Sequence, residues 1–308
     1  MLMQHIGYRK IMTQIDIADL DCIFLTYDEP LKEEFWIQVQ SMVPWAKRVD
    51  GVKGSDAAHK AAAKASDTDR FVLVDGDNMP EPEFFNQTLI IDEENHNKVF
   101  RWRARNAVNG LMYGNGGISC WTKEFVMNMQ THESSDGKDE TRVEFCFDPN
   151  YWAMHDCYSV TYPNGTDFQA WRAGFREGVK MCLDRGRKPS IQEFQDRIVQ
   201  RNLDNLTIWH NIGRDVENGE WCMAGSRMGT YMTMLTNWDY ALVQDFEELE
   251  KLWQTVKDHH PDVVMGRVAE DLETQLGLPM ANFQAAESKF FKHHYRSNWA
   301  NRGIMVRE

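Results

Sequence analysis

Arg70-Phe-Val-Leu-Val-Asp-Gly-Asp-Asn78 is the stretch that decides the fold class. Its four apolar residues form a short run rich in valine and bounded by polar residues, which predicts a buried strand. The strand leads directly into two carboxylates, Asp75 and Asp77, separated by Gly76. Since parallel sheets bind ligands at the carboxyl ends of their strands, this strand end is a candidate site.

Two strand–helix units precede this strand. Residues 21–28 are a short apolar run that predicts a strand, and residues 32–43 carry apolar side chains at helical spacing. Residues 46–52 are a second strand candidate. Ser55 then caps an alanine-rich helix. This alternation predicts a parallel sheet in an α/β fold.

The pattern changes after residue 97. Residues 98–108 are predicted to be extended, residues 116–121 form another strand, and residues 143–148 are a further candidate for the sheet. No internal repeat is visible.

From Asp167 onward the sequence is mostly helical. One helix is predicted over residues 167–183, and another begins at Ser190, where Ser-Ile-Gln-Glu matches a capping box. Two more helices are predicted over residues 221–236 and 240–259.

Composition is that of an ordinary globular protein. The 308 residues are 42% hydrophobic and 26% charged, enough for an α/β domain over 1–187 and a helical region over 188–308. We expect a cytoplasmic protein with reduced thiols and no membrane association, because the six cysteines are scattered and no apolar run could span a bilayer. The net charge of −13 means that a role on nucleic acid needs a local basic surface.

Asp75 and Asp77 are candidate metal ligands. Carboxylate oxygens are preferred by Mg²⁺ and Mn²⁺, and a glycine between them allows a ligand to approach the backbone. An ion held there would bridge a diphosphate and neutralise charge on a departing nucleoside diphosphate. An Asp-Gly turn with no ligand is the alternative.

The flanks of the motif carry a family resemblance. Val-Asp-Gly-Asp-Asn follows Gly-Ser-Asp-Ala-Ala-His-Lys-Ala-Ala-Ala and precedes Gly-Asn-Gly-Gly, and the whole resembles a GT-A glycosyltransferase over roughly residues 21–235. Residues 45–78 and 105–117 resemble the glycosyltransferase-like proteins of T-even-like phages and cyanophages. The resemblance implies a GT-A, Rossmann-like domain whose DxD motif holds Mn²⁺ or Mg²⁺ on a nucleotide-sugar donor, such as a UDP-linked hexose or pentose. If the chain is encoded by a phage, its compartment is the host cytoplasm.

The resemblance also assigns donor contacts. It places Thr26, Tyr27 and Asp28 on the base and ribose, and it places Lys53, Asp56 and Lys60 near the ribose or diphosphate. The positive end of the helix that starts at Ser55 favours phosphates independently. Asp56 and Lys60 lie one turn apart, so an ion pair between them is the alternative.

A general base is expected if the enzyme inverts the anomeric centre. Asp167 opens a predicted helix, loosely as the acidic motif of inverting GT-A enzymes does, although Thr166 stands where a second acid is usual. Asp167 could instead cap that helix, and Asp148 is the second candidate base. A retaining enzyme would need no such base.

Acceptor contacts are expected at two places. Asn115, Gly116 and Gly117 would let an acceptor pass close to the backbone, or they form a flexible turn. Arg101, Arg103 and Arg105 alternate with apolar residues, so a strand would place all three guanidinium groups on one face. Such a row suits the phosphates of the donor or of a nucleic-acid acceptor, and a solvated strand face is the alternative.

The family resemblance suggests a hydroxymethylated pyrimidine in phage DNA as the acceptor. The stretch from Lys289 to Arg296, continuing through Trp299 and Arg302, interleaves basic and aromatic residues as nucleic-acid surfaces do, or it packs its aromatics on the helical region. A glycan or a small molecule is the alternative acceptor.

Other interpretations compete with this one. Nucleotidyltransferases also pair carboxylates with Mg²⁺, but no glycine-rich loop follows the first strand here. A non-catalytic GT-A-like binding module is a third interpretation. A second acidic cluster, residues 215–220, could bind the sugar, order a lid or be a capped loop, and His155 and His210 are possible third metal ligands.

Overall fold

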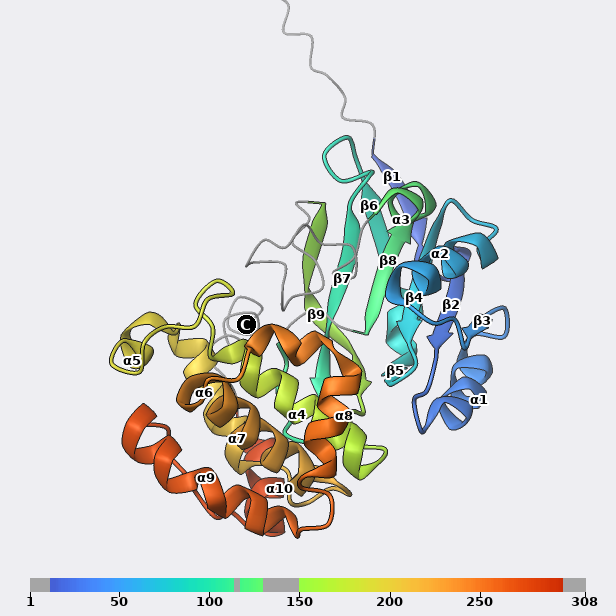
Figure 1. Cartoon of the computed structure of the whole chain (residues 1–308). Helices are drawn as coiled ribbons and strands as arrows, with labels where there is room; N and C mark the ends of the chain where they lie inside the picture. Colours follow the sequence, from blue (N-terminus) through green and yellow to red (C-terminus); the bar gives the residue numbers. More distant parts are fainter. Residues whose placement is uncertain (1–11, 114–116, 130–149, 296–308) are drawn as a thin grey trace, which may run out of the picture.

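The apolar runs of the first half form the centre of one sheet. The computed structural model describes residues 12–113, 117–129 and 150–295, and it shows a mixed α/β protein in which the sheet lies beside a group of helices (Figure 1). The order of the seven strands is β3-β2-β4-β8-β7-β9-β5. The strands are β2 Asp21–Thr26, β3 Lys47–Asp50, β4 Arg70–Asp75, β5 Asn78–Pro80, β7 Val99–Asn106, β8 Ile118–Thr122 and β9 Tyr151–Thr161.

The sheet is parallel only where strand–helix units build it. β3, β2 and β4 run parallel, as the alternation predicts. β8 lies antiparallel to both β4 and β7, β9 runs parallel to β7, and β5 is antiparallel to β9. The expectation of a parallel sheet therefore holds for three strands, and the sheet as a whole is mixed. A separate antiparallel pair joins β1 (Thr13–Asp16) to β6 (Thr88–Ile91).

Both faces of the sheet are covered. Helix α1 (Lys32–Met42) buries Phe35 and Val39 against the face that carries Phe24 and Trp102. Helices α2 (Ser55–Ala65) and α3 (Lys123–Asn128) cover the face of Leu73 and Trp121. Strand residues alternate between the two faces because successive side chains of a strand point in opposite directions.

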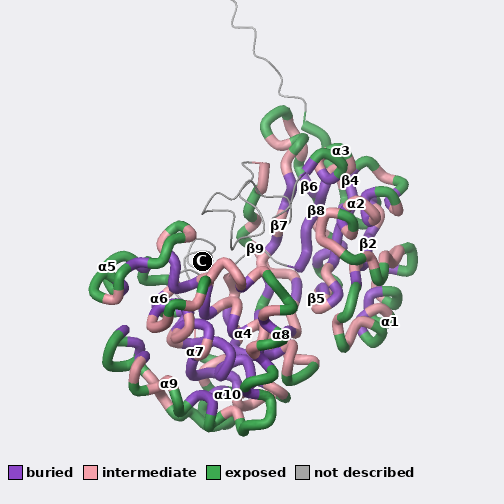
Figure 2. Tube along the Cα trace, in the orientation of Figure 1, coloured by how far each residue is buried: buried purple, intermediate pink, exposed green. Residues whose placement is uncertain are grey.

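The C-terminal part is helical, as expected. Its helices are α4 Asp167–Met181, α5 Phe194–Arg197, α6 Gln200–Asn211, α7 Gly219–Leu235, α8 Phe246–Gln254, α9 Pro261–Leu276 and α10 Ala285–His294. Figure 2 shows buried residues concentrated in the sheet and in the centre of this helical group.

Helices α4 and α7 are in direct backbone contact. A Cβ atom added at Gly174 of α4 would overlap the Cys222 carbonyl, and one at Gly225 of α7 would overlap the Trp171 carbonyl. Gly178 and Gly229 repeat this arrangement one turn further along, and Trp171 and Phe175 belong to the same core as α7. The helical core therefore begins at α4, ahead of residue 188, and the division of the chain at 187/188 stays a prediction.

Several local expectations were wrong. Gly54, with φ 95°, is the N-cap of α2, and Ser55 is its first residue without a capping bond. Ser190 and Glu193 exchange capping hydrogen bonds, but the chain makes only a turn there before the four-residue α5. The helix predicted over 240–259 is divided into a 3-10 turn, Tyr240–Gln244, and α8, because the Asp245 carboxylate caps α8 by accepting from the Glu247 and Glu248 amides.

No helix among the described residues is long and apolar enough to cross a membrane. The strand expected over residues 143–148 lies outside the described residues.

Candidate functional site

The carboxyl ends of β3, β2 and β4 meet at one edge of the sheet. Thr26 of β2 is in register with Asp50 of β3, and Leu25 of β2 is in register with Asp75 of β4. The Asp75 amide donates to the Gly117 carbonyl at 3.0 Å, and the Asp77 carbonyl accepts from the Tyr162 amide at 2.8 Å. The two aspartates of the motif are therefore held by backbone bonds from two sides at the edge where parallel sheets bind ligands.

The Asp75 and Asp77 carboxyls carry charge that nearby arginines offset only in part. Desolvation by burial raises the pKa of each to about 6, although both side chains keep some access to solvent. Arg101 opposes the rise at Asp75 while Glu29 adds to it, and the Asp75 charge adds to the rise at Asp77. No ion pair joins either carboxylate to another residue of the described parts. A metal ion that binds together with a ligand would relieve the repulsion between the neighbouring carboxylates.

Glu29 is a third carboxylate at this edge, and the sequence analysis missed it. Its Oε2 accepts from the Tyr27 amide at 2.7 Å, and a Cβ at Gly76 would lie only 2.7 Å from the same oxygen. Burial raises the Glu29 pKa, and the Asp77 and Asp28 carboxylates add to the rise. Gly76 is thus needed for the close approach of Glu29, with no positive φ involved. No local sequence signal marks Glu29, which is brought here by the turn after β2.

Asp75 and Asp77 would need a bound ligand, such as a phosphate, to complete the coordination of a metal ion. No group of three or more Asp, Glu, His or Cys side chains has the arrangement of a complete metal site in the described ranges. Mg²⁺ is commonly held by one or two carboxylates together with substrate phosphates and waters, so Asp75 and Asp77 suffice as the protein's share. The buried Asn78 Oδ1, beside Asp77, also has no hydrogen-bond partner among the described residues.

Arg172 of α4 is a second residue that the sequence analysis missed. Its positive charge lowers the pKa of Asp77 slightly, as the smallest of several contributions. The guanidinium lies 5.3 Å from the Phe168 ring centre and 4.8 Å from that of Phe246, so two aromatic faces hold it. Helix α4 therefore holds a positive charge close enough to act on Asp77.

The predicted donor residues after β2 differ in accessibility. The Thr26 hydroxyl is buried, donating to Asp50 Oδ1 at 2.7 Å and accepting from Arg48 Nε at 3.1 Å. Its side chain is occupied within the sheet and is not presented to a donor. Tyr27, with 45% exposure, and Asp28 are exposed, and Lys32 Nζ fixes the loop by donating to the Tyr27 carbonyl at 2.6 Å.

Lys53, Asp56 and Lys60 follow the carboxyl end of β3. Lys53 is exposed, whereas Asp56 and Lys60 are half-buried in the first two turns of α2. The start of α2 therefore lies at the same sheet edge as Asp75, and the contacts assigned to these three residues stay predictions.

The expected row of arginines is present on β7. Phe100, Trp102 and Ala104 are buried, whereas Arg101, Arg103 and Arg105 are half-buried or exposed. Arg101 is paired with Ser119, which pairs with Leu73, so this arginine lies on the face of the sheet that Asp75 shares. Its charge acts on Asp75, and its guanidinium lies 5.2 Å from the Tyr151 ring centre. Arg101 is thus part of the carboxylate site, and Arg105 is the exposed end of the row.

Of the remaining candidates for acceptor contacts and for the general base, the structure describes only Gly117 and Asp167. Asn115, Gly116 and Asp148 lie outside the described residues. Gly117, with φ 103°, supports the motif, because a Cβ there would overlap the Asn78 side chain. Asp167 is the exposed first residue of α4, and the helix cap is Thr166, whose hydroxyl accepts from the Gln169 amide at 3.1 Å. The alternative role of Asp167 as the cap is therefore excluded.

Two acids of the second acidic cluster are paired with basic residues outside it. Asp215 contacts Lys292 at 2.7 Å, and Glu220 contacts Arg214 at 2.6 Å. Arg214 also pairs with Asp262. Two of its three acids are thus neutralised by cations and Glu217 is exposed, which favours a structural loop over a sugar site or a lid.

The ion pair between Asp215 and Lys292 also shows what part of the basic C-terminal stretch does in the fold. Lys292 is held by Asp215 and donates to the Ala107 carbonyl, while Phe291 and Tyr295 pack against the helical core. Arg296, Trp299 and Arg302 lie outside the described residues. The described part of this stretch is mainly structural, although Phe290 is exposed.

The histidines do not extend the site. Burial lowers the pKa of His210 to about 3, and its Nε2 lies 3.1 Å from the Thr230 hydroxyl in the helical core. His155 is exposed on β9 and belongs to no metal-binding group within the described part of the chain.

Comparisons with known proteins add little. No protein-family model matches the chain, and no curated protein matches it. A solved structure described as a glycosyltransferase involved in the glycosylation of the major capsid of PBCV-1 is similar, with 15% identity and a TM-score of 0.28, over 46% of this chain and 91% of that one. At this TM-score the likeness establishes neither the fold nor the activity of the present chain.

Proposed function

We propose that this chain is a metal-dependent glycosyltransferase that takes a nucleotide sugar, such as a UDP-linked hexose or pentose, as its donor. The observation that carries the proposal is the Asp75–Asp77 pair, held at the carboxyl edge of three parallel strands with no ion pair to another described residue. The family resemblance in the flanks of the motif supports the same assignment. Mn²⁺ or Mg²⁺ held by Asp75 and Asp77 would neutralise the leaving diphosphate.

The residues around the pair have complementary roles in this proposal. Tyr27, exposed beside the motif, offers a ring for the base, and Asp28 offers a carboxylate for the ribose hydroxyls. Arg172 and Arg101 supply positive charge for the phosphates. Glu29 holds the Tyr27 amide and thereby fixes the loop that would contact the nucleoside.

Asp167 is the proposed general base of an inverting transfer. Its carboxylate would take the proton of an acceptor hydroxyl while that oxygen forms a bond to the anomeric carbon and the nucleoside diphosphate leaves. Its place at the exposed start of α4, five residues before Arg172, supports this role.

Calorimetry tests the metal assignment. UDP should bind more tightly with Mn²⁺ than without it, and Asp77→Asn should remove this enhancement without unfolding the protein. Asp258→Asn, at an exposed site in the helical region, is the matched control and should bind like the wild type. Binding that is independent of Mn²⁺, or an enhancement that survives Asp77→Asn, would refute the assignment.

Turnover tests Asp167. Asp167→Asn should lower kcat by about 10²- to 10⁴-fold and leave UDP binding intact. Near-normal turnover would move the role of base to Asp148 or indicate a retaining mechanism.

An assay of sugar transfer to different acceptors tests the identity of the acceptor. We propose a hydroxymethylated pyrimidine in DNA, and the arms of the assay are duplex DNA with hydroxymethylcytosine, unmodified duplex and a small glycan. Transfer to the glycan alone would reject DNA while leaving the glycosyltransferase proposal intact.

A further inference from the structure

A tight turn follows the C-terminal end of α4. The Asp184 amide donates to the Arg187 carbonyl at 2.9 Å, and the Arg187 amide donates to the Asp184 carbonyl at 3.0 Å. Between them, Arg185 has φ 51° and Gly186 has φ 79°. Positive φ at both central residues defines a type I′ turn, for which Asn-Gly is the favoured sequence.

Arg185 is an unusual residue for its backbone conformation. Asparagine and glycine enter the left-handed region readily, whereas a long side chain does so at a cost in stability. No hydrogen bond or ion pair joins the Arg185 side chain to another residue of the described ranges, so no visible contact offsets that cost. A non-glycine residue held in this region points to a functional constraint.

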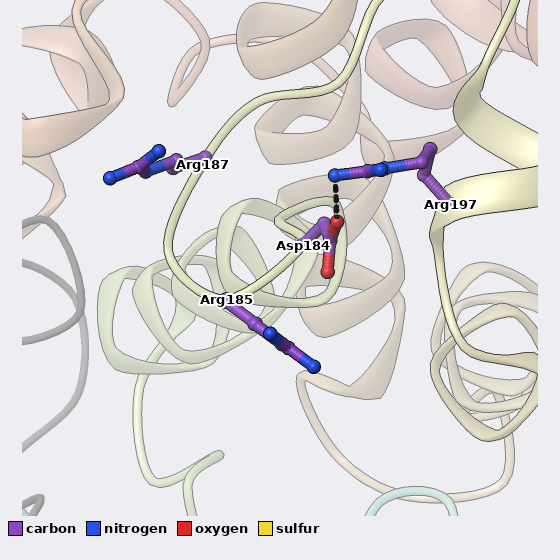
Figure 3. Close-up of a pocket in the computed structure, with 4 residues that line it drawn as sticks. All are labelled: Asp184, Arg185, Arg187 and Arg197. Carbon is purple, nitrogen blue, oxygen red and sulfur yellow. Dashed lines mark ion pairs between the residues drawn. The ribbon is translucent and has the colours of Figure 1, made fainter.

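The turn lines a cavity of about 420 Å³ (Figure 3). Among the described residues, Asp184, Arg185, Arg187 and Arg197 line it. Arg197 reaches across from α5 to Asp184 with an N–O distance of 2.7 Å, and its side chain stays 60% exposed. Of the three guanidinium groups in the lining, Arg197 pairs with the Asp184 carboxylate, whereas the Arg185 and Arg187 side chains point away from it (Figure 3).

The described lining of the cavity holds more arginines than carboxylates. The negative end of α4 attracts a cation, but Lys180 already lies in its last turn. On a chain with a net charge of −13, a cavity lined by three arginines is a local exception.

We propose that this cavity binds a phosphate group. Guanidinium groups form paired hydrogen bonds to phosphate oxygens, and the exposed Arg185 and Arg197 offer two such forks. The volume also accommodates part of the molecule that carries the phosphate. Helix α4 is about 22 Å long at 1.5 Å per residue; Arg172, whose charge acts on Asp77, lies in its first two turns, whereas the cavity follows its C-terminal end. This phosphate is therefore distinct from those of a donor at Asp75 and Asp77.

The variant Arg185→Asn separates a binding role from a role in the turn. Asparagine suits the left-handed conformation, so the Tm should rise by about 2 °C if that strain is relieved. The affinity for inorganic phosphate, measured by calorimetry at low salt, should fall at least tenfold. Arg267→Gln removes the same charge from an exposed position of α9 and should leave phosphate affinity unchanged.

Two arms identify the source of the phosphate. Duplex DNA that binds more tightly than inorganic phosphate, in a manner dependent on Arg185, would assign the cavity to a nucleic-acid backbone. Binding of inorganic phosphate alone, again dependent on Arg185, would assign it to a small phosphorylated molecule. No phosphate binding, or equal affinities in wild type, Arg185→Asn and Arg267→Gln, would overturn the proposal and leave Arg185 a turn residue.

Discussion

The two acidic clusters of this chain, Asp75–Asp77 and Asp215–Glu220, look alike in sequence and differ in electrostatics. The two half-buried acids of the second cluster each have a cation beside them, with Lys292 on Asp215 and Arg214 on Glu220, and its third acid, Glu217, is exposed. The first has none in contact within the described residues, and the pKa of both its carboxyls is raised to about 6. An acidic cluster that the protein neutralises stabilises the fold, whereas one left uncompensated is suited to a cation from outside.

The largest expected effect tests the paired cluster. Lys292→Met would leave the Asp215 carboxylate, whose side chain is 10% exposed, buried without its cation, and should lower the free energy of unfolding by about 3 kcal/mol. Urea denaturation measures the loss. Adding Asp215→Asn should recover much of it, because the unpaired charge is then gone. A stable Lys292→Met protein with weakened DNA binding would instead return Lys292 to a role on nucleic acid.

The uncompensated cluster should respond in the opposite direction. Asp77→Asn removes one of two repelling carboxylates, so the metal-free protein should gain about 1–2 kcal/mol at pH 8. Because the folded-state pKa is raised, the penalty from the ionised pair grows as pH rises from about 4 to 6 and persists above 6. The gain should therefore vanish below about pH 4, which urea titrations at both pH values would show. A variant less stable than wild type at pH 8 would contradict the electrostatic account.

Metal-dependent binding should follow the same titration. Protons compete with Mn²⁺ for the Asp75 and Asp77 carboxylates, so the Mn²⁺-dependent part of UDP affinity should fall at least tenfold per pH unit below about pH 6. Calorimetry between pH 5 and 8 measures this dependence, with metal-free UDP binding as the reference. An unchanged Mn²⁺ enhancement at pH 5 would place the ion elsewhere.

The smallest expected effect concerns the residue between the carboxylates. A methyl group at Gly76 would press on Glu29 Oε2 and on Thr26 Cγ2, which lies 2.9 Å from the added atom. Gly76→Ala should cost about 1 kcal/mol and weaken UDP binding several-fold, because Glu29 could no longer hold the Tyr27 amide. Gly266→Ala is the control, since a Cβ there meets no atom within 4 Å. Equal effects of the two substitutions would show that Glu29 does not position the loop.

Much of the sheet was predictable because its strands and helices are specified locally. β2, α1, β3, α2 and β4 appeared within a few residues of their predicted bounds, as did α4 and α7. α6, α9 and α10 had no individual prediction, and the capping bonds at Ser190 did not extend into a helix. Local signals mark where a helix can start, but tertiary packing determines how far it continues.

The site was predictable only where one segment contains it. Asp75 and Asp77 adjoin the strand that places them, so sequence alone was informative. Glu29 and Arg172 reach the site from β2's following turn and from α4, and no spacing along the chain connects them to Asp75. The role of Gly76 was attributed to ligand access, whereas the structure shows a side chain of the protein itself packed against it.

The glycine contact between α4 and α7 limits how this chain can be divided or recombined. A protein truncated after residue 187 would expose Trp171 and Phe175 to water and would be expected to aggregate on expression. The remaining fragment would lack the surface on which α7 closes. A chimera that replaced residues 188–308 with another helical region would have to supply small residues at the positions of Gly225 and Gly229, because α4 leaves no space there even for a methyl group.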